Sequence, residues 1–151
     1  MQTYGLWHKT SMIGGAAMIM KDNHLLVIHG GCMQAYEVSA LHMEVFACLQ
    51  CIEWARVHYF HNANIYTNSC NLVQLLQGSI PLDIASISKI QEITYQALLF
   101  NWCCVKKVPM SKVRHAFNAV VAILSIKRAA PTVHNPCCPY PIPYYPQPPW
   151  P

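Results

Sequence analysis

Residues 39–69 read SALHMEVFACLQCIEWARVHYFHNANIYTNS and combine the longest helical pattern of the chain with a strand pattern directly after it. Ser39 is a suitable N-cap, because its hydroxyl can accept a hydrogen bond from a backbone N–H of the first helical turn. Apolar residues then recur every three to four positions, as on the buried face of a helix: Leu41, Val45, Cys48, Ile52, Ala55 and Tyr59. We therefore predict a helix from Ser39 to about His61, a turn at 62–64 and a strand at 65–67.

The segments before this helix predict an antiparallel meander. Strand patterns occupy residues 2–7, 12–20 and 24–29. Lys21-Asp22-Asn23 is a plausible hairpin turn between the second and third of these strands, and Gly30-Gly31 is expected to end the meander.

The segments after residue 67 alternate between helix and strand patterns. Ser69 can cap a helix that continues to Gln77, and Pro81 and Asp83 open a second helix. Residues 102–108 read as a strand and residues 111–128 as a final helix. This order predicts an α/β fold: a mixed five-stranded sheet, three antiparallel strands followed by alternating helices and strands, with helices on its faces.

The C-terminal segment differs in composition from the rest of the chain. Residues 131–151 read PTVHNPCCPYPIPYYPQPPWP, and the prolines remove backbone donors and fix φ. Such a segment favours polyproline II or irregular structure over helix and interior strand. We therefore predict one domain over residues 1–130 and a Pro-rich, Tyr-containing tail over 131–151. The tail is either unstructured or a strap that docks on an aromatic groove.

The composition indicates a surface that is poor in charge. Hydrophobic residues make up 54% of the 151 residues and charged residues only 11%, with a net charge of +4. Ordinary globular domains carry about 25% charged residues. No run approaches the roughly 20 apolar residues that span a bilayer. An oligomer or partner interface is therefore the expected place for the surplus apolar area.

The eight cysteines are expected to be reduced thiols. No signal-peptide pattern precedes them, so we expect an intracellular protein, most simply a cytoplasmic one, with mitochondrion and nucleus left open. Cys48 and Cys51 form a CxxC, but it lies inside the helical pattern and lacks the turn of a metal knuckle. We predict no metal site and no cofactor.

The order of elements and four short motifs together resemble the ribonuclease H fold, and in particular its plant reverse-transcriptase-like branch. The resemblance covers about residues 2–128 and depends on the motifs occurring in the right order on the right elements. The matching stretches are Thr3-Tyr4-Gly5-Leu6-Trp7 with Ile13-Gly14-Gly15, Glu44-Val45-Phe46-Ala47, Tyr66-Thr67-Asn68-Ser69 before a Leu-rich helix, and Val108-Pro109-Met110 with Val113, Ala116-Phe117, Ala119 and Val120.

The resemblance implies a catalytic cluster of four acids, but three of the four positions are not acidic here. Such nucleases hold two Mg²⁺ ions, which require anionic oxygen ligands. The matching positions are Tyr4, Glu44, Asn68 and Phe117. We therefore predict a catalytically degenerate member, a pseudo-ribonuclease H that is not an enzyme. Glu44 is expected to be a structural hydrogen-bonding residue, with Asn68 and Tyr4 as candidate partners.

Two functions remain open for such a protein. The first is protein–protein interaction, as a homo-oligomer or in a stable complex with a regulatory role; low charge, seven methionines and sixteen aromatic residues favour it. The second is a nucleic-acid-binding domain that keeps a weak groove for an RNA–DNA hybrid without cleaving it. In that case we expect phosphate contacts from Lys106, Lys107, Lys112 and Arg114.

Overall fold

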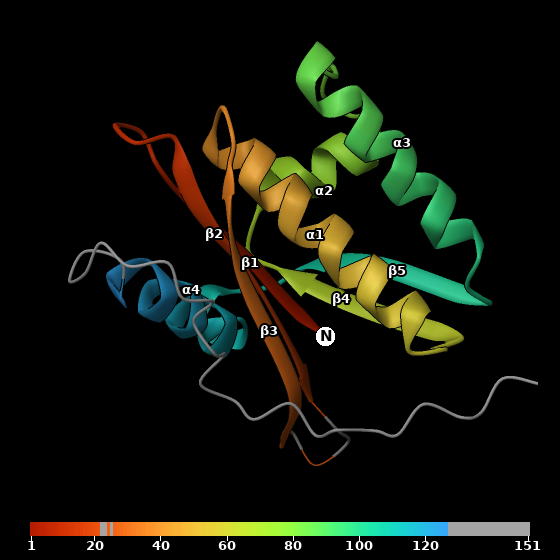
Figure 1. Cartoon of the computed structure of the whole chain (residues 1–151). Coiled ribbons are helices and arrows are strands. Elements are labelled where there is room, and N and C mark those ends of the chain that lie inside the picture. The colour runs from red at the N-terminus through yellow and green to blue at the C-terminus, as the bar shows by residue number, and fades with distance from the viewer. Residues whose placement is uncertain (22–23, 25, 127–151) are drawn as a thin grey trace, which may run out of the picture.

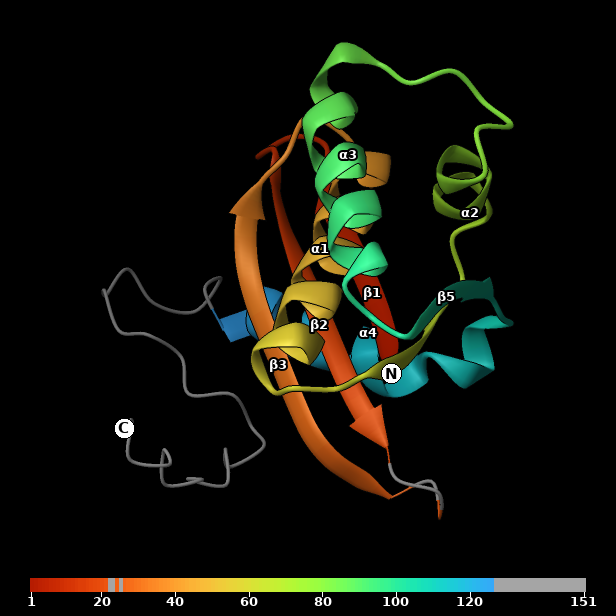
Figure 2. The same ribbon diagram turned by 90° about the vertical axis from the view of Figure 1, so that its right-hand side faces the viewer.

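The computed structural model describes residues 1–21, 24 and 26–126 and contains one mixed sheet with helices on both faces (Figures 1 and 2). The predicted tail at 131–151 lies outside the described residues. The elements, in chain order, are β1 (Gln2–His8), β2 (Ile13–Lys21), β3 (Val27–Tyr36), α1 (Ala40–Val57), β4 (Asn62–Thr67), α2 (Cys70–Leu76), α3 (Ile84–Leu98), β5 (Trp102–Lys107), the 3₁₀ turn η1 (Met110–Lys112) and α4 (Arg114–Ile126).

The sheet has the order β3-β2-β1-β4-β5, which confirms the predicted mixed five-stranded α/β architecture. β1, β2 and β3 pair in antiparallel fashion, and β4 runs parallel to both β1 and β5. Parallel strands need a crossover connection, and α1 provides it between β3 and β4. β3 and β5 are therefore the two edge strands.

α1 and α4 cover opposite faces of the sheet, as Figure 2 shows with α1 in front and α4 behind. α1 packs on β1, β2 and β4, and its buried side chains, among them Val45, Cys48 and Ile52, form the larger core with α2 and α3. α4 packs on β1, β2 and β3 and buries Ala116 and Val120 against β2. Each face thus has its own apolar core.

α3 is attached to the rest of the domain by polar contacts as well as by its apolar side. Lys89 Nζ lies 2.8 and 2.9 Å from the two carboxylate oxygens of the buried Glu37. At the N-terminus of the helix, Asp83 accepts from the backbone N–H of Ser86 and lies 3.1 Å from Nε2 of His42 on α1. These contacts fix the orientation of α3 beside α1.

Several predicted boundaries were wrong. α1 ends at Val57 rather than His61, because Tyr59 adopts a left-handed φ of 60° and reverses the chain. Residues 62–64 were predicted as a turn, but they start β4 and pair with 102–104 of β5. Local patterns could not indicate these pairings, since β5 is some forty residues away in sequence.

Another error concerns β3, which was expected to end at Gly30-Gly31 but continues to Tyr36. Gly31 pairs with Met18 and Met33 with Ala16, so β2 stabilises the longer strand. The final helix was predicted from residue 111; residues 110–112 form a 3₁₀ turn instead, and α4 begins at Arg114. Asp22 and Asn23 of the predicted hairpin turn lie outside the described residues.

No helix within the described part of the chain is both long and apolar enough to cross a membrane.

A testable consequence follows from the close approach of α1 to β1 at Gly5. A Cβ at this position would lie 2.7 Å from the backbone carbonyl of Met43, which cannot move without displacing the helix. We expect Gly5→Ala to lower the free energy of unfolding by about 3 kcal/mol, the upper range for overpacking a core. Urea denaturation of the full chain measures this. Gly31→Ala is the matched control, because its Cβ would meet only the flexible end of Met18 at 3.1 Å; equal losses in both variants would contradict the argument.

Candidate functional site

The positions singled out in the sequence lie where β1 and β4 meet. Gln2 of β1 is paired with Tyr66 of β4 in parallel register. Two residues further along each strand are Tyr4 and Asn68, so both lie at the same end of the shared ladder. α1 passes over one face of β1 at this level and α4 over the other.

Glu44 of α1 reaches the backbone of β1. Its Oε2 accepts a hydrogen bond of 3.2 Å from the N–H of Gly5. Because Gly5 has no side chain, α1 can approach β1 closely at this residue. Burial raises the pKa of Glu44 from its ordinary 4.5 to about 7, and the Gly5 hydrogen bond opposes that change only in part. The carboxyl group therefore carries a proton for much of the time at neutral pH. The sequence predicted Asn68 or Tyr4 as the partner of Glu44, and this prediction was wrong: the partner is the backbone N–H of Gly5.

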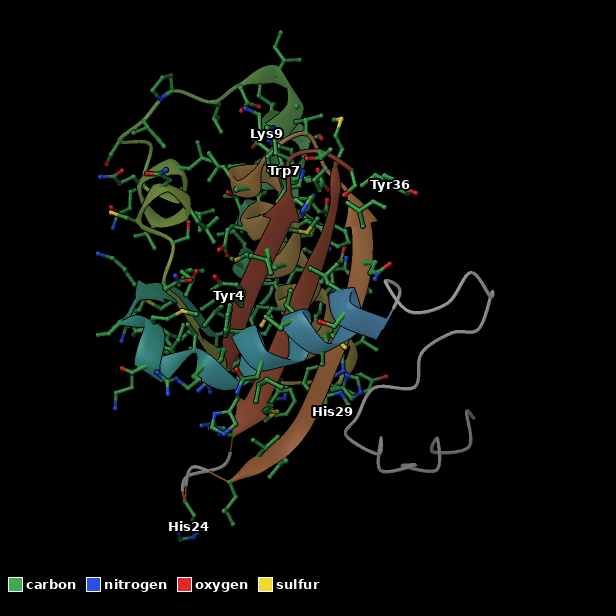
Figure 3. All side chains as sticks on the ribbon, turned by 90° about the vertical axis from the view of Figure 1, so that its left-hand side faces the viewer. Tyr4, Trp7, Lys9, His24, His29 and Tyr36 are labelled. Carbon is green, nitrogen blue, oxygen red and sulfur yellow. The ribbon has the colours of Figure 1, made fainter. Side chains whose placement is uncertain are left out.

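Tyr4 of β1 packs against Phe117 of α4, on the face of the sheet that α4 covers (Figure 3). Their ring centroids lie 5.3 Å apart at an interplanar angle of 83°, the edge-to-face geometry that aromatic pairs favour. Burial, and secondarily the nearby Glu44 carboxylate, raises the pKa of the Tyr4 hydroxyl above 10. The phenol is thus neutral and held by an apolar neighbour.

Asn68 follows the end of β4. Its Oδ1 is buried and has no hydrogen-bond partner among the described residues. A buried carbonyl without a partner is costly. It is a neutral oxygen, so it supplies no negative charge to the site.

The residues of this site do not fit a pair of divalent metal ions. Two Mg²⁺ ions need several anionic oxygens, and the site offers one carboxyl group with a pKa of about 7, a phenol, an amide and a phenyl ring. Across the described residues, no group of three or more His, Cys, Asp and Glu side chains could hold a metal ion. The arrangement has the character of a small packed core with one protonatable group.

The buried thiols of α1 offer no nucleophile. Burial raises the pKa of Cys51 to about 12 and that of Cys48 well above its ordinary value. A thiolate is the reactive form of cysteine, so both side chains are apolar core groups.

The four basic residues predicted for phosphate contact are all exposed, and they follow one another along the chain from β5 through η1 to the start of α4. Lys106 Nζ lies 5.5 Å from the centroid of the Trp102 ring, a cation–π contact. The structure adds one pair that the sequence did not indicate: Lys21 Nζ at the end of β2 lies 3.2 Å from Nδ1 of His115 on α4.

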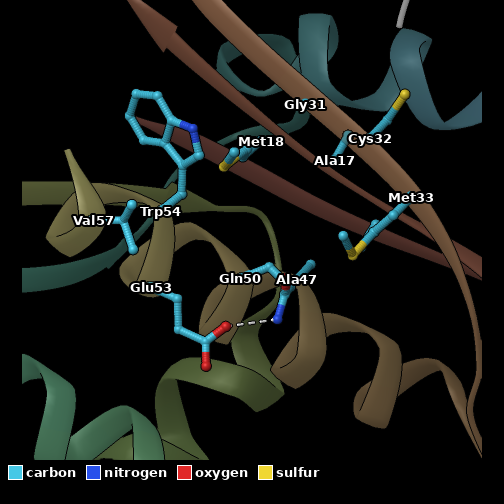
Figure 4. Close-up of a pocket in the computed structure, with 11 residues that line it drawn as sticks. Ala17, Met18, Gly31, Cys32, Met33, Ala47, Gln50, Glu53, Trp54 and Val57 are labelled. Carbon is cyan, nitrogen blue, oxygen red and sulfur yellow. Dashed lines mark hydrogen bonds between the residues drawn. The ribbon is translucent and has the colours of Figure 1, made fainter. Parts of the chain in front are cut away.

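A second feature without a sequence signal is a groove between α1 and the β2–β3 hairpin, with a cavity volume of about 300 Å³ (Figure 4). In its lining, Trp54 of α1 stacks with His29 of β3 and with His58, with ring centroids 4.2 and 3.9 Å away, and the two imidazoles lie 5.8 Å from each other. Residues 29 and 54 belong to different elements, so only the fold brings them together.

Comparison with known proteins yields structural matches only. No protein-family model matches the chain, and no curated protein matches it either. Among solved structures, the chain is similar to ribonuclease H1 of the archaeon Halobacterium salinarum, with a TM-score of 0.73, 12% identity, and coverage of 83% of this chain and 97% of that one.

Two further solved structures match the chain to a similar extent. The N-terminal ribonuclease H domain of Rv2228c from Mycobacterium tuberculosis gives a TM-score of 0.74 and 12% identity over 85% of this chain and 95% of that one. LC11-RNase H1 in complex with an RNA/DNA hybrid gives a TM-score of 0.70 and 16% identity, with coverage of 82% of this chain and 96% of that one. The chain therefore has the ribonuclease H fold, as the sequence motifs predicted.

The raised pKa of Glu44 predicts a pH-dependent stability. Below pH 4.5 the carboxyl group is protonated in both folded and unfolded chains; as the pH rises to about 7 the unfolded chain releases its proton first, so the folded state loses stability. We expect Glu44→Gln to remove this loss, so that the variant gains roughly 2–3 kcal/mol relative to the unchanged protein between pH 4.5 and 8. Chemical denaturation at a series of pH values measures the difference. The control Glu53→Gln, on the same helix, retains Glu44 and should retain the slope; a pH-independent difference for Glu44→Gln would refute the assignment.

Proposed function

We propose that this protein is a non-catalytic member of the ribonuclease H fold, of the plant reverse-transcriptase-like branch, that acts by binding another protein. The partner proposed first is a second copy of the chain. The observation that carries the proposal is a set of exposed apolar side chains at the two ends of α3 and just beyond its C-terminal end, with exposed but uncharged polar residues between them.

The non-catalytic part of the proposal is supported by the packing at Tyr4, Glu44, Asn68 and Phe117. Phe117 fills space with an apolar ring, and the edge-to-face contact with Tyr4 leaves no anionic oxygen on the α4 side. Glu44 is committed to the Gly5 backbone and is half protonated near pH 7. Metal-dependent phosphodiester cleavage is therefore not the activity that these side chains support.

The interaction surface consists of exposed apolar residues at the two ends of α3 and just beyond its C-terminal end, and we call it the α3 surface. Its members are Ile84, Tyr95, Leu98, Leu99 and Trp102. Ile84 is 91% exposed, an unusual position for a large aliphatic side chain. Exposed apolar side chains that lie close together on a surface often mark an interaction site, whereas single exposed apolar residues are common on any protein.

The two charged residues of α3 do not reduce the apolar character of this surface. Lys89 is turned toward Glu37, and the half-buried Glu92 accepts a hydrogen bond from Gln96 on the same helix. The exposed polar residues between the apolar ends are Ser88, Gln91 and Thr94, which are uncharged. Interface cores are depleted of charge in the same way.

A single charge on the α3 surface should disrupt the association. We expect Leu98→Arg to convert a dimer to a monomer, or to weaken self-association at least tenfold, because an interface core does not tolerate an unpaired charge. Light scattering over a range of concentrations measures the oligomeric state. The control Ser125→Arg places the same charge on an exposed position of α4 and should leave the state unchanged. A chain that is monomeric at all concentrations would rule out the second copy as partner.

A second candidate function is nucleic-acid binding without cleavage. It is favoured by the exposed row Lys106, Lys107, Lys112 and Arg114, and by the fold it shares with LC11-RNase H1, which was solved with an RNA/DNA hybrid. Phosphate contacts supply most of such affinity, and they weaken steeply with salt.

Titration with an RNA–DNA hybrid at two salt concentrations separates the two functions. We expect weak binding with little hybrid-specific affinity and no cleavage with Mg²⁺ present. Tight binding that falls steeply with salt, and that Lys107→Glu reduces more than Lys9→Glu, would instead support the nucleic-acid function. Mg²⁺-dependent cleavage abolished by Glu44→Gln would overturn the non-catalytic proposal.

A further inference from the structure

The groove between α1 and β3 exists because the helix covers only part of the sheet. α1 packs on β1, β2 and β4, whereas β3, the edge strand, extends past it. The strand side of the groove carries Met18 and Met33, and the helix side carries Ala47, Trp54 and Val57 (Figure 4). Gly31 keeps the floor open, since a Cβ there would lie 3.1 Å from the end of Met18.

The groove is apolar and has an aromatic wall. Among the described residues, the one charged residue in its lining is Glu53, and this carboxylate already accepts a hydrogen bond of 2.8 Å from Gln50. Trp54 stacks with both His29 and His58, and its ring centroid lies 5.8 Å from that of Phe60. Grooves lined by aromatic rings are the usual docking sites of proline-rich segments, which lose little entropy on binding.

We propose that this groove binds the chain's own proline-rich C-terminal segment, residues 131–151, within the same molecule. That segment holds nine of the eleven prolines of the chain together with three tyrosines and a tryptophan, and has no Asp, Glu, Lys or Arg. An uncharged, aromatic, proline-rich segment matches an apolar groove with an aromatic wall.

The place where α4 ends supports this occupant. Gln34 of β3 donates a hydrogen bond of 3.1 Å to the backbone carbonyl of Ile123, so the last turns of α4 lie against the edge strand that forms one side of the groove. Residues 127–151 therefore leave the described fold at this edge, on the α4 face. The groove is on the other face of the same strand.

The length of the segment is sufficient. Passing around a sheet edge from one packed layer to the other covers about 20 Å, since layers pack about 10 Å from a sheet. About seven residues of polyproline II at 3.1 Å each span that path. The 25 residues from 127 to 151 thus leave most of the proline-rich stretch to lie along the groove.

Attachment to the same chain also favours this occupant over a separate partner. A short tether gives an effective concentration in the millimolar range. Even a weak contact, formed mainly by proline and tyrosine rings on Trp54, is then populated. The α3 surface shares no residue with the groove, so this inference and the proposed function stand or fall separately.

A photo-crosslinking experiment on the full-length chain tests the inference. Val57, at the end of the groove, is replaced by p-benzoylphenylalanine, and after irradiation the products are separated by mass and mapped by peptide sequencing. Val57 is 62% exposed, so the probe does not disturb the core. We expect a product of monomer mass in which position 57 is joined to a residue within 131–151. A dimer-mass product, or no product to that segment, would overturn the proposal.

Two matched controls separate docking from random collision. The same probe at Tyr95 on α3, which is 59% exposed, should give a several-fold lower yield of tail cross-link. With the probe at 57, Met33→Gln in the groove should lower the yield several-fold, whereas Met12→Gln, at a position of similar exposure (45% against 41%), should not. Equal yields from both probes, or equal effects of both Met substitutions, would count against a specific groove contact.

Discussion

The contact between α1 and β1 at Gly5 positions much of the molecule. The backbone of Met43 and Glu44 lies so close to this strand that only glycine fits, and the Gly5 N–H is then available to the carboxyl group of Glu44. α1 has nine buried residues, and three of them, Cys48, Cys51 and Ile52, are fully inaccessible. The position of α2 and α3, which pack on α1, depends on this contact in turn.

The same contact explains the chemistry of Glu44. Close packing excludes water from Glu44, and a single backbone hydrogen bond does not compensate for the lost solvation, so the pKa rises to about 7. On the other side of β1, Phe117 fills the space beside Tyr4 with a hydrocarbon ring. A site that would need concentrated negative charge to hold metal ions is instead packed with groups that are neutral or nearly so.

The surface is shaped by the small number of charged residues in the chain. Some of the few charged residues form intramolecular contacts, such as Lys89 with Glu37 and Asp83 with His42. The exposed apolar side chains of the α3 surface are separated by uncharged polar residues, and Glu53 is the one charged residue among the described residues that line the groove beside β3. The two surfaces lie on different elements, so the contacts proposed for them share no residue.

The sequence alone determined the order of the elements, the helix caps at Ser39, Ser69 and Asp83, and the scarcity of carboxylates. These follow from side-chain periodicity and capping, which act over a few neighbouring residues. The tertiary structure decided the length of β3, the strand identity of residues 62–64, the Glu44–Gly5 hydrogen bond and the groove at Trp54. Each of these depends on residues distant in sequence that meet only through packing, as Tyr4 and Phe117 do across 113 positions, and no local pattern encodes such a contact.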